Sequence, residues 1–161
     1  MTQVRVQVAD WAVGRGDTLI TTLGLGSCVA ITIHDPSTLI GGLAHVLLPA
    51  QAATRAVANP AKFAESAVPM LIEEMAALGA GPPSRLVAKL AGGASMFAAL
   101  LQSGGLNVGE RNVVAARAAL ERAGVRVAAE DTGGDHGRSI YFHVSDGRVE
   151  VRSLKRGTNV L

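Results

Sequence analysis

Cys28 is the only cysteine in the chain, and His45, a histidine that could act as its base, follows a predicted turn. A thiolate is a strong nucleophile, and an ion pair with an imidazole lowers the thiol pKa from about 8.5, which supplies thiolate at neutral pH. Thr22, six residues before the cysteine, carries a hydroxyl that could orient the imidazole. These residue types predict nucleophilic catalysis, with Cys28 as the nucleophile and His45 as the base.

A predicted hairpin, made of residues 28–34 and 39–45, brings the thiol and the imidazole together. Both segments are rich in Val, Ile, Leu and Thr, as β-strands are. The four residues between them begin with Asp-Pro, which is typical of a type I turn. A turn at this place predicts that Cys28 lies directly opposite His45, with Cβ atoms about 4.5–5.5 Å apart. A bulge at Gly41-Gly42 would shift the register by one and turn the two side chains to opposite faces.

A structural role for the cysteine is the alternative, because a lone cysteine is often a small buried hydrophobic residue. The glycines at positions 24 and 26 favour catalysis, since they let the backbone turn sharply just before Cys28. Backbone N–H groups near Gly26 and Ser27 are therefore candidate donors to the oxyanion of a tetrahedral intermediate.

The length of 161 residues predicts one domain over residues 1–161, and 48% apolar with 17% charged residues describes a globular chain. No apolar run approaches the roughly 18 residues that a membrane-spanning helix needs, and the N-terminus lacks the apolar core of a signal peptide. We therefore expect a cytoplasmic protein that does not insert into a membrane. A single cysteine also excludes an intramolecular disulfide.

The net charge is +2, and arginines gather towards the end of the chain, at Arg138, Arg148, Arg152 and Arg156. They are candidates for docking an acidic protein partner, with a merely solvated face as the alternative. Aromatic residues make up only 3% of the chain, which leaves few platforms for stacking bases and argues against nucleic-acid binding. The four histidines lack the paired short spacing of a zinc site, so we expect no metal.

The hydrophobic patterns predict an α+β fold, in which antiparallel or mixed β-sheets pack as a distorted sandwich with two main flanking helices. Asn59-Pro60 and Asn107 are predicted to start the two helices, and Gly79 and Gly124 to end them, with a kink or a break at Pro69. Besides the hairpin, strands are expected at residues 4–9, 17–22, 85–90, 125–129, 139–144 and 148–154, and a short helix at 94–101.

Several motifs in the same order resemble the CheD family of bacterial chemoreceptor glutamine deamidases. They are TLGLGSC, the Asp-Pro turn, GGLAHVLLP, KLAGGASMF, GERNV and DTGGDHGRSIYF, and they extend from Thr22 to about Val151. The resemblance implies that Cys28, His45 and Thr22 match the catalytic set of that family. It also implies a fold similar to the catalytic domain of the cytotoxic necrotising toxins.

The activity implied by the resemblance is that of a protein-glutamine glutaminase. Such an enzyme hydrolyses the side-chain amide of selected receptor glutamines through a thioester and needs no cofactor. The implied partners are the cytoplasmic helices of chemoreceptors and, in some organisms, a chemotaxis phosphatase of the CheC type. Two alternatives stay open, a non-catalytic regulatory module that docks on receptors or on such a phosphatase, and a cysteine peptidase.

Overall fold

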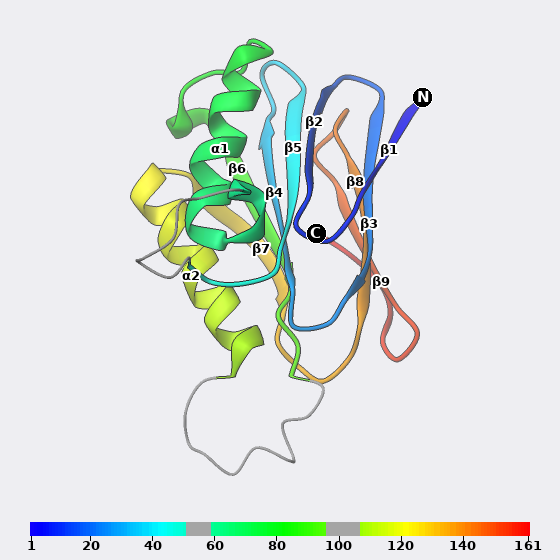
Figure 1. Ribbon diagram of the computed structural model, residues 1–161. Coiled ribbons are helices and arrows are strands. Elements are labelled where there is room, and N and C mark those ends of the chain that lie inside the picture. The colour runs from blue at the N-terminus through cyan, green and yellow to red at the C-terminus, as the bar shows by residue number, and fades with distance from the viewer. Residues whose placement is uncertain (51–58, 96–106) are drawn as a thin grey trace.

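The computed structural model describes residues 1–50, 59–95 and 107–161, which form two mixed β-sheets packed face to face with helices on one side (Figure 1). Sheet A has the strand order β1-β3-β8-β9-β10, and sheet B the order β2-β5-β4-β6-β7. The strands of sheet A are β1 Thr2–Val6, β3 Thr18–Leu25, β8 Arg138–His143, β9 Val149–Ser153 and β10 Gly157–Val160. Those of sheet B are β2 Trp11–Arg15, β5 Ile40–Val46, β4 Val29–Asp35, β6 Val87–Gly92 and β7 Arg126–Thr132. The predicted α+β sandwich with flanking helices is confirmed.

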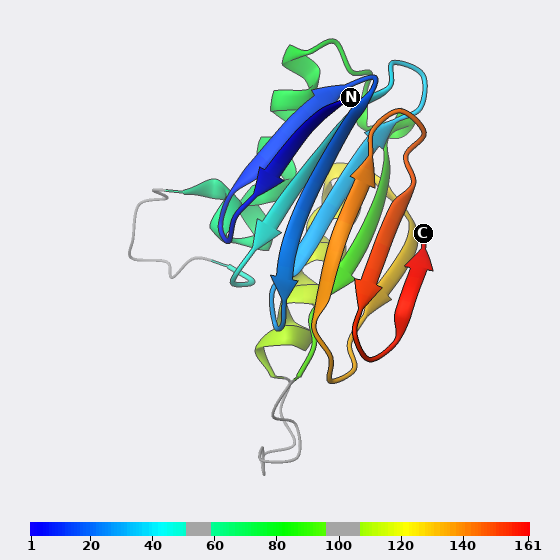
Figure 2. The same ribbon diagram turned by 90° about the vertical axis from the view of Figure 1, so that its right-hand side faces the viewer.

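The two helices, α1 Ala64–Ala77 and α2 Val108–Ala123, cover the face of sheet B that points away from sheet A (Figure 1). Sheet B is therefore buried on both faces, and β4 is a continuous run of buried residues, as is usual for a strand in the middle of three layers. The opposite face of sheet A carries no helix among the described residues, and Figure 2 shows its strands in front. No helix in the described part of the chain is both long and apolar enough to span a membrane.

Helix α2 has the predicted ends. Asn107 Oδ1 accepts a hydrogen bond from the Glu110 amide at 2.9 Å, and Asn107 Nδ2 donates to Glu110 Oε1 at 3.0 Å. Gly124 ends the helix in the left-handed conformation, at φ 76°. The capping signal in the sequence therefore positions the helix as expected.

Helix α1 starts later than predicted. Asn59 caps a short 3-10 turn, Pro60–Lys62, and α1 begins only after Phe63, which is extended. Phe63 is extended because it forms a parallel bridge with Leu48, beyond the end of β5. The helix then continues through Pro69 without a break.

Two strands were not predicted, β2 and β10. Both lie at the edge of a sheet, and β10 is exposed along its whole length and pairs only with β9. Such strands form through backbone hydrogen bonds to a neighbour, so they lack the hydrophobic alternation that sequence analysis detects. The short helix expected at residues 94–101 lies mostly outside the described residues.

The predicted register of the β4–β5 hairpin is wrong by two. Asp35 pairs with Ile40, and Ala30, not Cys28, pairs with His45. The turn is displaced because Asp35 stays in β4, where its Oδ1 accepts the Ser37 amide at 2.9 Å, and Leu39 takes φ 56° in the turn. The pairing runs on without interruption past the two glycines of β5, so no bulge turns His45 to the other face.

Candidate active site

Cys28 lies where the chain crosses from sheet A to sheet B, between β3 and β4. The Gly26 carbonyl accepts the Ala94 amide at 2.9 Å, and the Cys28 carbonyl accepts the Gly93 amide at 2.8 Å. Gly92 has φ 107°, and a Cβ there would collide with the Cys28 carbonyl oxygen. The glycine pair at the end of β6, Gly92-Gly93, is thus required for close approach of the two backbones, which fixes the loop that carries the thiol.

His45 points from β5 into the layer between the sheets and is fully buried. Side chains alternate along a strand, so Cys28 lies on the same side of sheet B as Ala30, the partner of His45. Cys28 belongs to the apolar cluster between the two sheets, which also contains Ala30 and Leu43. The thiol and the imidazole therefore both face the layer between the two sheets, with Cys28 one residue beyond Val29, whose pairing with Val46 ends the β4–β5 ladder.

Thr22 reaches His45 from the opposite sheet. It is fully buried on β3, and its Oγ1 lies 2.7 Å from His45 Nδ1. A bulge between Thr22 and Leu25 follows directly, with Gly24 at φ 73°. Bulges of this kind bend a strand and change the aim of its side chains. Here the bend leads β3 from Thr22 towards the Cys28 loop.

The hydrogen bonds of Thr22 determine the tautomer of His45. The single hydroxyl proton of Thr22 is donated to the Val6 carbonyl at 2.9 Å, so Oγ1 accepts from His45 and Nδ1 carries the ring proton. In the neutral imidazole, Nε2 is then the unprotonated atom with a free lone pair. Nε2 is buried and makes no hydrogen bond to any described residue. This arrangement leaves it available as a base.

Burial favours the neutral form of both the Cys28 thiol and the His45 imidazole. It lowers the pKa of His45 to about 4 and raises the pKa of the Cys28 thiol, which its own backbone N–H offsets only in part. The expected resting ion pair, with a thiol pKa below the usual value, is therefore wrong. A neutral imidazole beside a neutral thiol can still act by general base catalysis, taking the proton as the sulfur attacks.

Arg138 is not on the surface, which corrects its place among the docking candidates. It is 3% exposed, and its Nε donates to Asp131 Oδ1 at 3.0 Å. It lies at the start of β8 opposite Leu25, next to the β3 bulge. The side chain is an almost fully buried ion-pair partner of Asp131 that reaches the surface only as part of the lining of two hollows.

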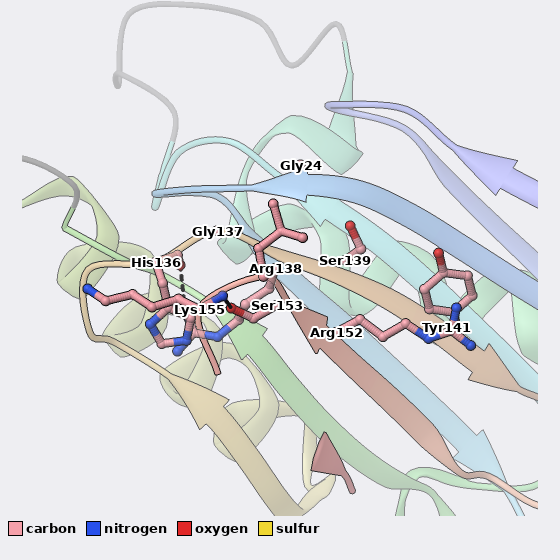
Figure 3. Close-up of a pocket in the computed structure, with 10 residues that line it drawn as sticks. Gly24, His136, Gly137, Arg138, Ser139, Tyr141, Arg152, Ser153 and Lys155 are labelled. Atoms are coloured by element: carbon pink, nitrogen blue, oxygen red, sulfur yellow. Dashed lines mark hydrogen bonds between the residues drawn. The ribbon is translucent and has the colours of Figure 1, made fainter. Parts of the chain in front are cut away.

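The other three arginines reach solvent on or near the outer side of sheet A. Arg152 lies over the ring of Tyr141, 3.8 Å from its centroid (Figure 3). It also donates to Glu150 at 2.9 Å. Arg148 is within 4.0 Å of Asp146 and Glu150, and Arg156 is exposed. They form a surface of mixed charge.

Two hollows of about 510 and 560 Å³ open beside this surface. Gly24, Ser139, Tyr141, Arg152 and Lys155 are among the residues that line the first (Figure 3). Neither hollow is lined by Cys28 or His45. The first hollow therefore neighbours the β3 bulge at Gly24, and neither of the two contains Cys28 or His45.

Sequence analysis missed Asn112. This residue of α2 is fully buried, and its Nδ2 donates to the Ser27 carbonyl at 2.9 Å and to the Leu47 carbonyl at 3.1 Å. The signal was present in the sequence, because Asn112 lies beside Val113 on the apolar side of an amphipathic helix. A polar amide at such a position must find hydrogen-bond partners in the core.

A family model and individual relatives of this chain point to the same family. Residues 47–153 match the family model described as CheD chemotactic sensory transduction. Three relatives are each named a probable chemoreceptor glutamine deamidase CheD. They come from Caldanaerobacter subterraneus (43% identical, covering 98% of this chain and 97% of the relative), Pyrococcus horikoshii (46%, 98% and 96%) and Geobacter metallireducens (47%, 95% and 94%).

The crystal structure of a Neisseria meningitidis protein of the DUF152 family has a similar fold. The TM-score is 0.55 at 16% identity, covering 91% of this chain and 71% of that chain. At this identity the likeness concerns the fold alone. The match to the CheD family model covers residues 47–153 and so starts after His45. It therefore depends on residues other than Cys28, His45 and Thr22.

Proposed function

The chain belongs to the CheD family, and we propose that it hydrolyses the side-chain amide of selected glutamines in chemoreceptors, giving glutamate and ammonia. Cys28 is the nucleophile, His45 the base and Thr22 the residue that holds the imidazole. The observation that carries this assignment is the 2.7 Å contact between Thr22 Oγ1 and His45 Nδ1. It leaves Nε2 as the free base on the face of sheet B that also carries the only thiol.

The first half of the reaction forms a thioester. His45 Nε2 takes the Sγ proton while the sulfur attacks the amide carbon, so an imidazolium and a tetrahedral oxyanion form together. Thr22 Oγ1 continues to accept a hydrogen bond from the Nδ1–H of His45 and keeps the ring in place. The imidazolium then gives its Nε2 proton to the amide nitrogen, which leaves as ammonia as the C–N bond breaks.

The second half of the reaction hydrolyses the thioester. His45, neutral again, takes a proton from a water molecule that attacks the carbonyl carbon. The second tetrahedral intermediate collapses, the C–S bond breaks, and the sulfur recovers its proton from the imidazolium. Backbone N–H groups near Gly26, Ser27 and Cys28 are the proposed donors to the oxyanion in both halves.

Receptor docking is assigned to the outer side of sheet A. Arg152 and Lys155 line the 510 Å³ hollow beside the β3 bulge, and Arg156 lines the 560 Å³ hollow. Arg148 is exposed just before β9, and exposed acidic faces of receptor helices would complement these side chains. Receptor signalling helices lie in the cytoplasm, so we place the protein there too.

A second candidate is a regulatory module that docks on receptors or on a CheC-type phosphatase without chemistry. It is favoured by the burial of Cys28, which is 9% exposed and has a raised thiol pKa. Replacing Cys28 by Ala separates the two functions, because docking tolerates the loss of one sulfur atom and deamidation does not.

The test is the intact mass of a receptor cytoplasmic fragment after incubation with the protein. Deamidation adds about one mass unit for each glutamine converted, and the gain disappears with Cys28→Ala and with His45→Ala. Cleavage of the fragment would instead indicate a peptidase. An unchanged mass with the wild-type protein, or the same gain with Cys28→Ala, would refute the proposed function.

A further inference from the structure

Asn112 connects the two chain segments that carry the reacting groups. Both protons of its Nδ2 are donated, one to the carbonyl of Ser27, just before Cys28, and one to the carbonyl of Leu47, two residues after His45. The side chain is fully buried, so water does not compete for these bonds. One amide group of α2 therefore links the nucleophile loop to the end of β5.

The three carbonyls of the nucleophile loop each have a partner. Those of Gly26 and Cys28 accept backbone amides from Ala94 and Gly93, whereas the Ser27 carbonyl accepts the Asn112 side chain. The orientation of the Ser27–Cys28 peptide is therefore the one that depends on a side chain.

This orientation determines where the Cys28 amide points. In a trans peptide the C=O and N–H bonds point in opposite directions, and the described chain has no cis peptide. Because Asn112 holds the Ser27 oxygen towards α2, the Cys28 N–H points away from the helix. It lies on the side of the Cys28 Sγ atom, and it helps to lower the pKa of that thiol. Among the described residues, no carbonyl accepts this N–H.

We propose that Asn112 is a positioning residue, which orients the Ser27–Cys28 peptide so that the Cys28 N–H donates to the oxyanion formed on the substrate carbon. This inference rests on the proposed deamidation. The oxyanion forms on the carbon that bonds to Sγ, so a donor within the same residue lies close to it in every tetrahedral intermediate. Without Asn112 the Ser27 carbonyl loses the partner that fixes it, and the peptide rotates to find another, which carries the N–H away.

Two reactions of Cys28 separate this role from general damage. Amide hydrolysis passes through an oxyanion, whereas alkylation by iodoacetamide is a direct displacement at carbon and forms none. Loss of the oriented donor therefore slows hydrolysis and, at a pH high enough to ionise the thiol in every variant, leaves alkylation nearly unchanged. Loss of the fold, which changes the burial of the thiol, alters both reactions.

The experiment compares Asn112→Asp and Asn112→Ala with wild type, and with Asn107→Ala as the matched control. Asn107 is the asparagine that caps the N-terminus of the same helix, and its hydrogen bonds go to Glu110 and to neither Ser27 nor Leu47. Its replacement removes the cap alone. We expect kcat for deamidation of a receptor fragment to fall about tenfold to hundredfold in both Asn112 variants. This is less than the roughly hundredfold to thousandfold for outright removal of an oxyanion donor, because the N–H is displaced and not removed. Alkylation rates stay within about threefold of wild type, and Asn107→Ala keeps kcat while its Tm falls.

An unchanged kcat in the Asn112 variants, with an active wild type, would overturn the inference and leave the proposed function standing. A parallel loss of hydrolysis and alkylation would also overturn it, because Asn112 would then position the thiol or the fold. A wild-type protein that does not deamidate the fragment would refute the proposed function itself, and this inference with it.

Discussion

The Thr22 hydroxyl and the His45 ring form a hydrogen bond of 2.7 Å that crosses from sheet A to sheet B. Because Thr22 donates its own proton to Val6, the bond requires the proton of His45 to be on Nδ1. A threonine on one sheet thus determines which nitrogen of a histidine on the other sheet can act as a base.

Replacing Thr22 by Val should lower kcat for deamidation about tenfold to hundredfold, because the imidazole loses the acceptor that fixes its tautomer and orientation. Thr22→Ser keeps the hydroxyl and should recover most of the activity. Thr32→Val is the matched control, since Thr32 is also buried and donates to a backbone carbonyl, that of Lys89. If kcat fell equally in the Thr22→Val and Thr32→Val variants, the effect would be one of stability alone.

The pH dependence of Cys28 alkylation reports the resting state of the thiol. Burial raises its pKa, so the rate with iodoacetamide should be low at pH 7 and rise about tenfold per pH unit to beyond pH 9. His45→Ala should change the rate at pH 7 by less than about threefold, because no ion pair is lost. A rate that is already high and independent of pH near neutrality would show a resting thiolate and contradict this prediction.

Stability should fall as the pH is lowered from about 6.5 to about 4. His45 has a folded pKa of about 4 and an ordinary value of 6.5 when unfolded, so in this window the unfolded chain binds the extra proton. The free energy of unfolding should decrease by up to about 3 kcal/mol, as measured by urea denaturation at several pH values. If the free energy of unfolding fell with the same slope against pH in His45→Gln as in wild type, the loss of stability would come from other titratable groups.

The sequence was sufficient to predict that Cys28 and His45 share a face, although the register was wrong. Side chains repeat every two residues along a strand, so an error of two in the hairpin leaves the faces unchanged. The displacement came from Asp35, whose carboxylate is buried and accepts amides from both Ser37 and Gly81. Contacts with residues far along the chain, such as Gly81, are not visible in a turn motif.

The resting charge state and the role of Asn112 could not be predicted for a similar reason. The thiol pKa depends on how deeply the second sheet buries Cys28, and this is a property of the packed sandwich and not of the motif. Asn112 contacts Ser27 across 85 positions of sequence. The proposed catalytic set was predicted because TLGLGSC and GGLAHVLLP resemble family motifs.

Substrate selection depends on the surface, because a thiol, an imidazole and a hydroxyl can activate almost any amide. Reversing Arg152 and Arg156 to Glu should lower kcat/KM for a receptor fragment about tenfold, with a larger loss at low salt, where charge attraction is less screened. Hydrolysis of a short glutamine peptide should stay within about twofold of wild type.

Arg111→Glu with Arg126→Glu is the control for this last prediction. Both arginines are exposed, and they lie on α2 and β7, away from the outer side of sheet A, so the control makes the same change in net charge elsewhere. An equal loss in the two double variants would mean that only the total charge matters. Equal loss on the fragment and the peptide would locate the damage at the site, and no loss on either would assign Arg152 and Arg156 to a solvated face that plays no part in docking.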